Sequence, residues 1–268
     1  MGRTLARSSR SPSARRAGRY APAAQHHATG PESRGSTPLA IEAFVLAALA
    51  QSSLLVSGLV VYRFNFTPKV VGYLAGFGAG ALISAVSFDL IPEATELTTV
   101  ESALGLIAGS AIFVIADPMV EARTGGDDDN PMGIVVGAIV DGLPESLIFG
   151  IVVTTGDPIS IAFVAAVWVS NVPQALAPSA SLAKQGWPIT KTALVWGAVV
   201  LACALTAVFG YVLGENVSAA TGAAAAAVAA GGVLAMLTDS LMPFAFAKGG
   251  DNAGIWTVVG FTVTLAMV

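Results

Sequence analysis

Five side chains with oxygen donors lie inside two strongly apolar stretches of the chain. Asp141 and Glu145 are four residues apart, so a helix would present both carboxylates on one face. Ser170, Asn171 and Gln174 follow in the next apolar stretch, where the first and the last are again four residues apart. Because carboxylate, hydroxyl and amide oxygens are ligands for hard divalent cations, we expect these five residues to bind a metal ion.

The depth of the two acids is the strongest indication of function. A charged side chain at the centre of a bilayer costs about 2.5–3.5 kcal/mol on insertion scales, so it needs a polar interior or a partner. No lysine or arginine lies at the centre of any apolar stretch. Asp141 and Glu145 must therefore bind a cation or hold a proton. The serines and prolines are less specific, because a serine can simply join two helices and a proline can simply kink one.

Both polar stretches carry a proline inside the expected helix. The motif VDGLPESL at 140–147 is repeated 29 residues later as VSNVPQAL at 169–176. Pro144 and Pro173 lack an N–H, which leaves the carbonyl four residues earlier without its helical donor. Such a carbonyl can bind an ion where helices line a cavity. We expect two antiparallel, kinked helices at mid-membrane, where transporters place their substrate sites.

The composition requires a membrane. The 268 residues are 54% hydrophobic and 11% charged, with a mean hydropathy of +0.74, whereas soluble domains are about 25% charged. No charge occurs within residues 43–61, 194–214 or 216–238, and about 20 apolar residues span a bilayer as a helix. The single cysteine, Cys203, lies in an apolar run and cannot form an internal disulfide. The sequence therefore predicts an all-α polytopic membrane protein.

We expect eight transmembrane helices. They lie at residues 39–61, 70–91, 103–121, 132–154, 158–181, 190–213, 221–244 and 253–268. The loops after the odd-numbered spans carry all six basic loop residues, which are Arg63, Lys69, Arg123, Lys184, Lys191 and Lys248. This bias places those loops in the cytoplasm and both termini outside, and we expect the plasma membrane. The acidic residues 127–129 then face the cytoplasm, where they are solvated or gather cations loosely.

The second and seventh spans contain a more distant repeat. GALISAVSFDLIP at 80–92 and GGVLAMLTDSLMP at 231–243 both begin with glycine and end with proline, and each has an aspartate shortly before the proline. The two spans run in opposite directions through the bilayer, as an inverted repeat of a secondary transporter requires. Asp89, Glu93 and Asp239 lie near the span ends, where they either reach water or line the ion pathway.

Residues 1–38 differ from the rest of the chain. Seven of the 13 basic residues lie there against one acid, and Ser, Ala and Pro fill much of the remainder. The segment lacks the apolar core of a secretory signal, and its Arg/Ser-rich character resembles a transit peptide. We expect a disordered tail in which His26 and His27 are weak metal candidates. We expect residues 39–268 to form the transmembrane transporter domain.

The central motifs resemble those of the ZIP (Zrt-, Irt-like) family of divalent metal transporters over residues 39–268. The stretch LIPEA at 90–94 is similar to the end of the family's second span, and Glu145 and Gln174 match its ligand positions. The resemblance implies eight spans, both termini outside, and uptake of Zn²⁺ or Fe²⁺ towards the cytoplasm. It implies a transported metal ion and the lipid bilayer as partners, with no resident cofactor and no nucleic acid, and it leaves a homodimer open.

Several ligand positions of the ZIP pattern carry other residues here. Asp141 stands in place of a histidine and Gly142 in place of an asparagine. Ser170 and Asn171 replace a histidine and an acid, and Ala175 replaces a glutamate. The nitrogen ligands are lost, and the remaining oxygen donors favour Mg²⁺, Mn²⁺ or Ca²⁺ over Zn²⁺. We expect a divalent cation transporter with weak affinity.

Two other classes of function compete with transport. An intramembrane enzyme is disfavoured, because the chain has no Gly-x-Gly-Asp, Gly-x-Ser-x-Gly or His-Glu-x-x-His motif. Asp141 and Glu145 also lie on one helix, which is the wrong arrangement for a two-helix acid pair. We therefore expect a protein that is not an enzyme. A ZIP-like membrane protein without transport activity, acting as a sensor or structural partner, is the alternative that the missing histidine ligands support.

Overall fold

The computed structural model describes residues 36–91, 97–124, 131–155, 159–216 and 219–268. These residues all fall within one contact unit, Gly35–Val268. Residues 1–35 of the predicted disordered tail, Glu93 and the acidic residues 127–129 lie outside the described residues, whereas residues 36–38 of that tail are helical. The regular structure of the described part is helical throughout.

Seven of the described helical spans are long and apolar enough to cross a membrane. The helices are α1 Ser36–Val60, α2 Pro68–Ala85 with η1 Val86–Leu90, α4 Thr99–Thr124, α5 Pro131–Thr155, α6 Ile161–Lys184, α7 Ile189–Glu215, and α8 Ala219–Met236 with η3 Leu237–Leu241 and α9 Met242–Gly249. An eighth apolar helix, α10 Asn252–Leu265, is shorter, with 14 residues. The predicted all-α polytopic membrane protein is confirmed, and the seventh span continues to Gly249 instead of ending at residue 244.

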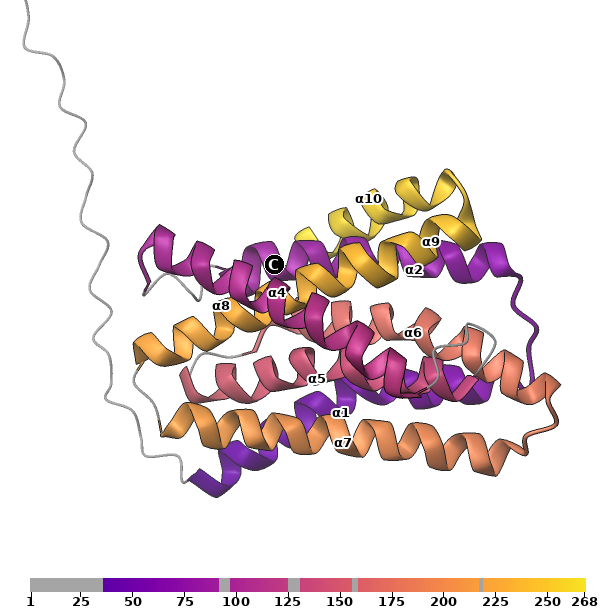
Figure 1. The fold of residues 1–268 in the computed structure, drawn as a ribbon, viewed down its shortest axis with the longest axis horizontal. Helices are drawn as coiled ribbons and strands as arrows, with labels where there is room; N and C mark the ends of the chain where they lie inside the picture. Colours follow the sequence, from indigo (N-terminus) through magenta and orange to yellow (C-terminus); the bar gives the residue numbers. More distant parts are fainter. Residues whose placement is uncertain (1–35, 92–96, 125–130, 156–158, 217–218) are drawn as a thin grey trace, which may run out of the picture. The chain divides into compact units, whose positions relative to one another are not determined.

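The helices pack as two bundles. In the first bundle, α1 packs against α6 and α7, and α5 packs against α7. In the second, α2 packs against α9 and α10, and α4 packs against α8. The bundles meet where α2 crosses α6 and where α5 crosses α8. Figure 1 shows α1, α5 and α7 on one side and α2, α9 and α10 on the other. The polar motifs of α5 and α6 thus lie where the bundles meet.

Close glycine contacts reveal the inverted repeat in atomic detail. A Cβ atom on Gly80 of α2 would lie 1.8 Å from the carbonyl oxygen of Thr257 in α10. A Cβ atom on Gly231 of α8 would lie 2.1 Å from the carbonyl oxygen of Leu106 in α4. Gly80 and Gly231 are 151 residues apart, and so are Leu106 and Thr257. The two helix pairs are therefore equivalent crossings in which the backbones touch, as small residues permit in membranes.

The repeat also places two π-helical segments in equivalent positions. η1 begins six residues after Gly80, and η3 begins six residues after Gly231. Such widened turns are rare and often occur at functional sites. α5 and α6 are continuous α-helices that contain Pro144 and Pro173, and the predicted kinks stay a prediction. The departures from α-helical geometry lie in the repeated spans of the second bundle.

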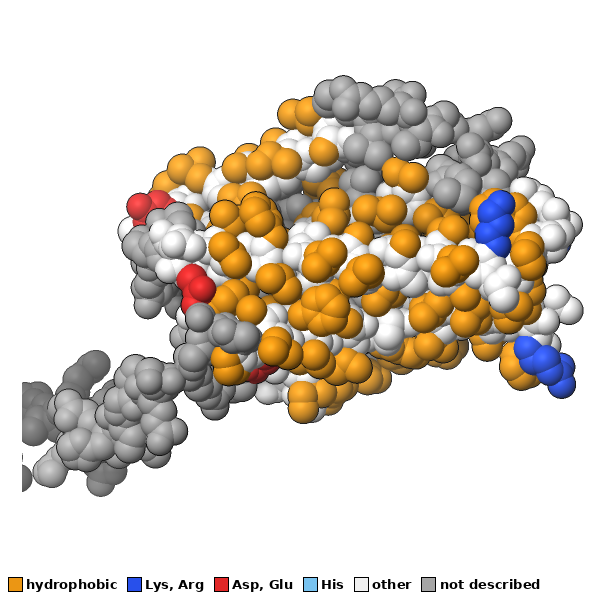
Figure 2. Space-filling view, turned by 90° about the horizontal axis from the view of Figure 1, so that it is seen from below, with side chains coloured by type: hydrophobic (Ala, Val, Ile, Leu, Met, Phe, Trp, Pro, Cys, Tyr) orange, Lys and Arg blue, Asp and Glu red, His pale blue; other side chains and the backbone are white. Residues whose placement is uncertain are grey.

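Charge separates the two ends of the helical unit. Figure 2 shows an apolar face with basic side chains at one end and acidic side chains at the other. The described basic side chains are exposed and lie close to helix ends, and they are Arg63, Lys69, Lys184, Lys191 and Lys248. We call these two ends the basic end and the acidic end. α2 and α5 run from the basic end to the acidic end, and α6 and α8 run back.

We expect Gly80→Ala and Gly231→Ala to destabilise the protein to a similar extent, by about 1–3 kcal/mol, because each added methyl group meets a backbone carbonyl. Gly197→Ala in α7 is the matched control, since its Cβ would meet nothing within 4 Å. Alanine favours helices over glycine, so the control should be neutral or slightly stabilising. Thermal unfolding of the purified protein in detergent measures all three. Equal stability of all three variants would contradict the two crossings.

Candidate functional site

Gln51 of α1 is the centre of the polar network in the first bundle. Its side chain is fully buried. The amide nitrogen donates a hydrogen bond to Oε2 of Glu145 at 3.2 Å, and the amide oxygen accepts one from Nδ2 of Asn171 at 2.8 Å. The network therefore joins α1, α5 and α6. Because Asn171 holds the oxygen of Gln51, the amide group of Gln51 directs its N–H towards the carboxylate.

Only one of the two carboxylate oxygens of Glu145 has a hydrogen-bond partner among the described residues. The residue is 0% exposed, and its Oε2 atom accepts the bond from Gln51. The other carboxylate oxygen, Oε1, is buried and has no hydrogen-bond partner among the described residues. A buried acceptor without a partner costs about 1–3 kcal/mol, and more when it is charged. One oxygen of the carboxylate is thus available for a cation or a proton.

Asp141 lies one turn nearer to the basic end on the same helix. It is 8% exposed, which makes it slightly more accessible than Glu145. The two carboxylates interact electrostatically and repel each other when both are charged. All described lysine and arginine side chains are exposed, so none is buried beside these acids. A cation between the two carboxylates would remove their mutual repulsion.

Gly142 lets α7 approach α5 closely beside the acids. A Cβ atom on Gly142 would lie 2.9 Å from Sγ of Cys203 in α7 and 3.5 Å from the amide group of Gln51. Cys203 is fully buried, and its thiol interacts with Ser146 and with the charge of Glu145. The only cysteine of the chain therefore lies at the level of the acidic pair.

The other predicted ligands have different surroundings. The hydroxyl of Ser170 donates to the carbonyl of Val167 on its own helix at 2.9 Å. Its backbone packs against α2, since a Cβ atom on Gly78 would lie 2.6 Å from Cα of Ser170. Both amide atoms of Gln174 are buried without a partner among the described residues. The structure thus joins Glu145 and Asn171 through Gln51, and places Ser170 at the contact between the bundles.

The predicted pathway acids differ in exposure. Asp89 of η1 is half-buried, and the hydroxyl of Ser160 hydrogen-bonds its carboxylate. Asp239 of η3 is exposed, like its neighbours Thr238 and Ser240. The two aspartates occupy positions of the repeat that differ by one residue, which turns them about 100° apart around the helix axis. Only Asp89 faces the first bundle.

No group of three or more His, Cys, Asp or Glu side chains that could hold a metal ion occurs within the described part of the chain. A cation at Glu145 and Asp141 would therefore take its remaining ligands from amides, hydroxyls, backbone carbonyls or water. Mg²⁺ keeps several waters and is commonly held by one or two carboxylates. The residues present are compatible with such weak, oxygen-based binding.

The sequence reasoning missed Gln51, Ser146 and Cys203. Gln51 begins the polar triplet Gln-Ser-Ser inside an otherwise apolar first span, and this triplet was a signal that could have been followed. Ser146 follows Glu145 directly, so its place beside the acids could also have been inferred. Cys203 gave no signal, because a cysteine in an apolar run behaves as a small hydrophobic residue.

Comparison with known proteins identified no relative. No protein-family model matches the chain, and no curated protein matches it either. The resemblance to ZIP transporters therefore depends on the sequence motifs alone and stays a prediction.

We expect Gln51→Leu and Asn171→Leu to destabilise the protein, because each leaves a buried polar group without its partner. Since they share one hydrogen bond, the double variant should lose less than the sum, with a coupling of about 0.6–1.7 kcal/mol. Thermal unfolding in detergent gives the coupling. Ser53→Ala is the control, because its buried hydroxyl bonds only within α1. Strict additivity of the two substitutions would refute the network.

Proposed function

We propose that the protein transports a divalent metal cation across the membrane towards the cytoplasm, in the manner of ZIP transporters. The observation that carries this proposal is Glu145, a fully buried carboxylate in mid-membrane with one oxygen lacking a partner among the described residues. An ionisable residue at this depth is rare and is usually functional. The second carboxylate, Asp141, lies one turn away and supplies the second negative charge.

Each polar residue would then have a defined role. Glu145 and Asp141 are the anionic ligands, and Gln51 holds one oxygen of Glu145 while leaving the other for the ion. Asn171 fixes the orientation of Gln51. Gln174, whose amide is buried without a described partner, and Ser170 complete the shell when the bundles move against each other. Because no covalent chemistry is assigned to any of these residues, we propose a transporter and not an enzyme.

The inverted repeat supports alternating access. Repeats of opposite orientation give transporters two equivalent arrangements, one open to each side of the membrane. The two bundles meet at the α2–α6 and α5–α8 contacts, and the acidic pair lies on α5. Rocking of the first bundle against the second would expose the site to one side and then to the other. Following the charge bias, we propose the plasma membrane, both termini outside, and the basic end in the cytoplasm.

A ZIP-like membrane protein without transport activity is the second candidate. It is favoured by the finding that the described residues hold no group of three His, Cys, Asp or Glu side chains around one point. Such a protein would keep the fold and the buried network, and would act as a sensor or structural partner. Transport and this alternative differ in one measurable respect, which is uptake of metal by a host cell.

We expect cells that lack their own importer to accumulate a divalent metal when they express this protein. Glu145→Gln should abolish uptake and Asp141→Asn should reduce it severalfold, because each removes a ligand charge while keeping its side-chain shape. Glu42→Gln, which changes an exposed acid of α1, should leave uptake unchanged. Accumulation of radioactive Mn²⁺ and Zn²⁺ checks this. Wild-type uptake that persists in both site variants would refute the assigned ligands, and no uptake in the wild type would favour the alternative.

We expect the purified protein to bind Zn²⁺ only slightly more tightly than Mn²⁺, because the proposed ligands are oxygen atoms and lack the extra affinity that nitrogen and sulfur ligands give Zn²⁺. Competition between the two metals in equilibrium dialysis measures the order. Cys203→Ala should leave the Mn²⁺ affinity unchanged and should not weaken Zn²⁺ binding. Zn²⁺ binding that is much tighter than Mn²⁺ binding and that falls in Cys203→Ala would instead make the thiol a ligand.

A further inference from the structure

A polar pocket opens at the basic end of the second bundle, between the start of α2 and the turn that joins α9 to α10. Its volume is about 430 Å³, which lies within the roughly 300–1,000 Å³ of small-ligand sites. The side chains of Lys69, Tyr73, Lys248, Asp251 and Asn252 line it, together with the α9–α10 turn. None of the proposed metal ligands lines this pocket, so cation transport does not account for it.

Close backbone packing builds the pocket. α2 and α10 both begin at the basic end and lie side by side (Figure 1). A Cβ atom on Gly76 would lie 2.6 Å from the carbonyl oxygen of Ala253, and one on Gly72 would meet the backbone of Gly249. Gly250 has a φ of 65°, in the left-handed region that glycine adopts easily, and it redirects the chain from α9 into α10. The first turns of both helices therefore open onto the same pocket.

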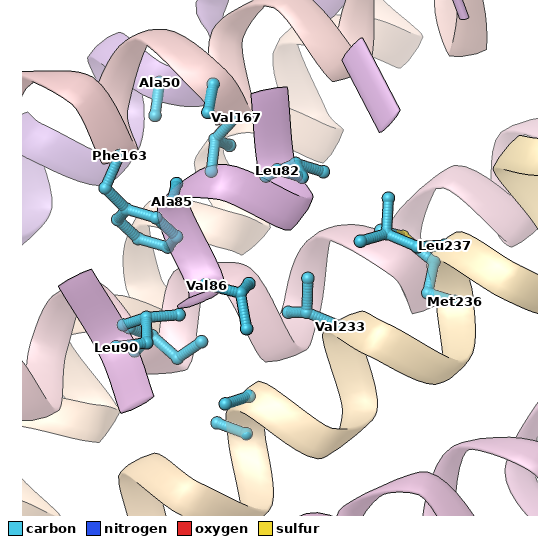
Figure 3. Close-up of a cluster of buried hydrophobic side chains, with 14 of the residues drawn as sticks. Ala50, Leu82, Ala85, Val86, Leu90, Phe163, Val167, Val233, Met236 and Leu237 are labelled. Carbon is cyan, nitrogen blue, oxygen red and sulfur yellow. The ribbon is translucent and has the colours of Figure 1, made fainter. Parts of the chain in front are cut away.

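The other face of α2 is fixed by the first bundle. Figure 3 shows Leu82 and Ala85 of α2 facing Phe163 and Val167 of α6. All four side chains belong to one buried apolar cluster. α2 is thus held by α6 on one side and by α10 on the other. The walls of the pocket are the ends of firmly packed helices.

The charge of the pocket favours an anion. Lys69 lies in the first turn of α2, and Lys248 lies in the last turn of α9. Asp251 is the only acid in the wall, so two lysines against one aspartate give a net charge of +1. No acidic side chain of the described residues forms an ion pair with either lysine. The N-terminal ends of α2 and α10 add partial positive charge. A ligand with one net negative charge would match this wall.

An aromatic pair lies just below the charges. Tyr73 follows Lys69 by four residues, and Trp256 follows Asn252 by four, so both rings lie about 6 Å deeper in the membrane. The rings stack with centroids 5.9 Å apart. The amide nitrogen of Asn252 donates to the hydroxyl oxygen of Tyr73 at 3.4 Å, which leaves the tyrosine proton for another acceptor. Tyrosine and tryptophan at this depth are typical of the membrane interface.

The inverted repeat provides an internal comparison. Under the offset of 151 residues, the counterparts of Lys69 and Lys248 are Ala220 and Leu97. The equivalent helix start, in the first turn of α4, carries an acid, Glu101. The repeated fold therefore forms without basic residues at these positions. The two lysines of the pocket are an addition to the basic end, which the packing of the helices does not require.

We propose that this pocket binds the headgroup of an anionic phospholipid from the leaflet at the basic end. Lys69 and Lys248 neutralise the phosphate, and the hydroxyl of Tyr73 donates to it. Asp251 accepts from a hydroxyl group of the headgroup, and Trp256, which is 40% exposed, contacts the upper part of an acyl chain. Basic pockets between transmembrane helices on the cytoplasmic side bind acidic headgroups, and the charge bias places the basic end there. This inference does not depend on metal transport.

Native mass spectrometry of the purified full-length protein in neutral detergent tests the pocket. Dioleoyl phosphatidylglycerol should bind about tenfold more tightly than dioleoyl phosphatidylcholine, since a lysine near an anionic surface contributes about fivefold. Lys69→Gln and Lys248→Gln should each weaken phosphatidylglycerol binding by about fivefold. Tyr73→Phe should weaken it severalfold, because a hydrogen bond to a charged group is lost while the ring is kept.

Lys184→Gln is the matched control, because it removes an exposed lysine at the same end of the first bundle, outside the pocket. It should leave phosphatidylglycerol binding unchanged. All substituted side chains except Tyr73 are exposed, so the variants should keep the thermal unfolding temperature of the wild type. Equal binding of the two phospholipids, or equal losses in all three lysine variants, would overturn the proposed site.

A measurement in bilayers locates the lipid and separates it from soluble phosphate. Phosphatidylglycerol with brominated acyl chains, present as a minor component of phosphatidylcholine vesicles, should quench the fluorescence of Trp256 more strongly than brominated phosphatidylcholine at the same fraction. Trp256→Phe identifies the share of that residue. The excess quenching should disappear in the variant that carries both Lys69→Gln and Lys248→Gln.

Millimolar inorganic phosphate should not reduce the excess quenching, because it lacks acyl chains to contact the rings. Equal quenching by the two brominated lipids would refute lipid binding at this place. Loss of the excess on addition of inorganic phosphate would instead identify the pocket as a site for a soluble phosphate compound and would contradict the lipid.

Discussion

The cost of burying the carboxylate of Glu145 determines the structure around it. A charge in hydrocarbon needs hydrogen-bond donors, and the first bundle supplies one through Gln51, which Asn171 holds in place. At the same level Gly142 allows α7 to approach α5 closely, because a Cβ atom there would lie 2.9 Å from Sγ of Cys203. The amide pair Gln51 and Asn171 therefore lowers the free-energy cost of burying the carboxylate of Glu145.

The inverted repeat provides the frame for this site without being symmetric in its details. The glycine crossings of α2 with α10 and of α4 with α8 are related by the same offset of 151 residues in the sequence. The two π-helical segments also coincide under the repeat, but their aspartates are displaced by one position. As a result Asp89 reaches the first bundle through Ser160, while Asp239 is exposed. A single-residue difference between the halves is sufficient to give the two aspartates different surroundings.

The fold was predictable because it follows from patterns that lie within single segments. Apolar runs of about 20 residues predicted the helices, and the paired glycine–proline stretches predicted the inverted repeat. The partners in the site were less predictable, because each helix contributes only one or two polar residues from a distant part of the chain. Gln51 and Glu145 are 94 residues apart and share no local pattern.

A half-satisfied carboxylate is well suited to a transported ion. If donors occupied both oxygens of Glu145, a cation would have to displace them, and the acid would remain stable without an ion. If neither oxygen were held, the cost of the empty site would favour a bound ion or proton too strongly for release. Gln51 satisfies one oxygen and leaves the other without a described partner, and under the proposed transport function this would bring the free energies of the loaded and empty states closer together. Conduction and transport both require binding that is strong enough to admit an ion and weak enough to release it. A site with few ligands, all of them oxygen atoms, is therefore consistent with transport. The missing histidine ligands do not by themselves indicate that metal binding has been lost.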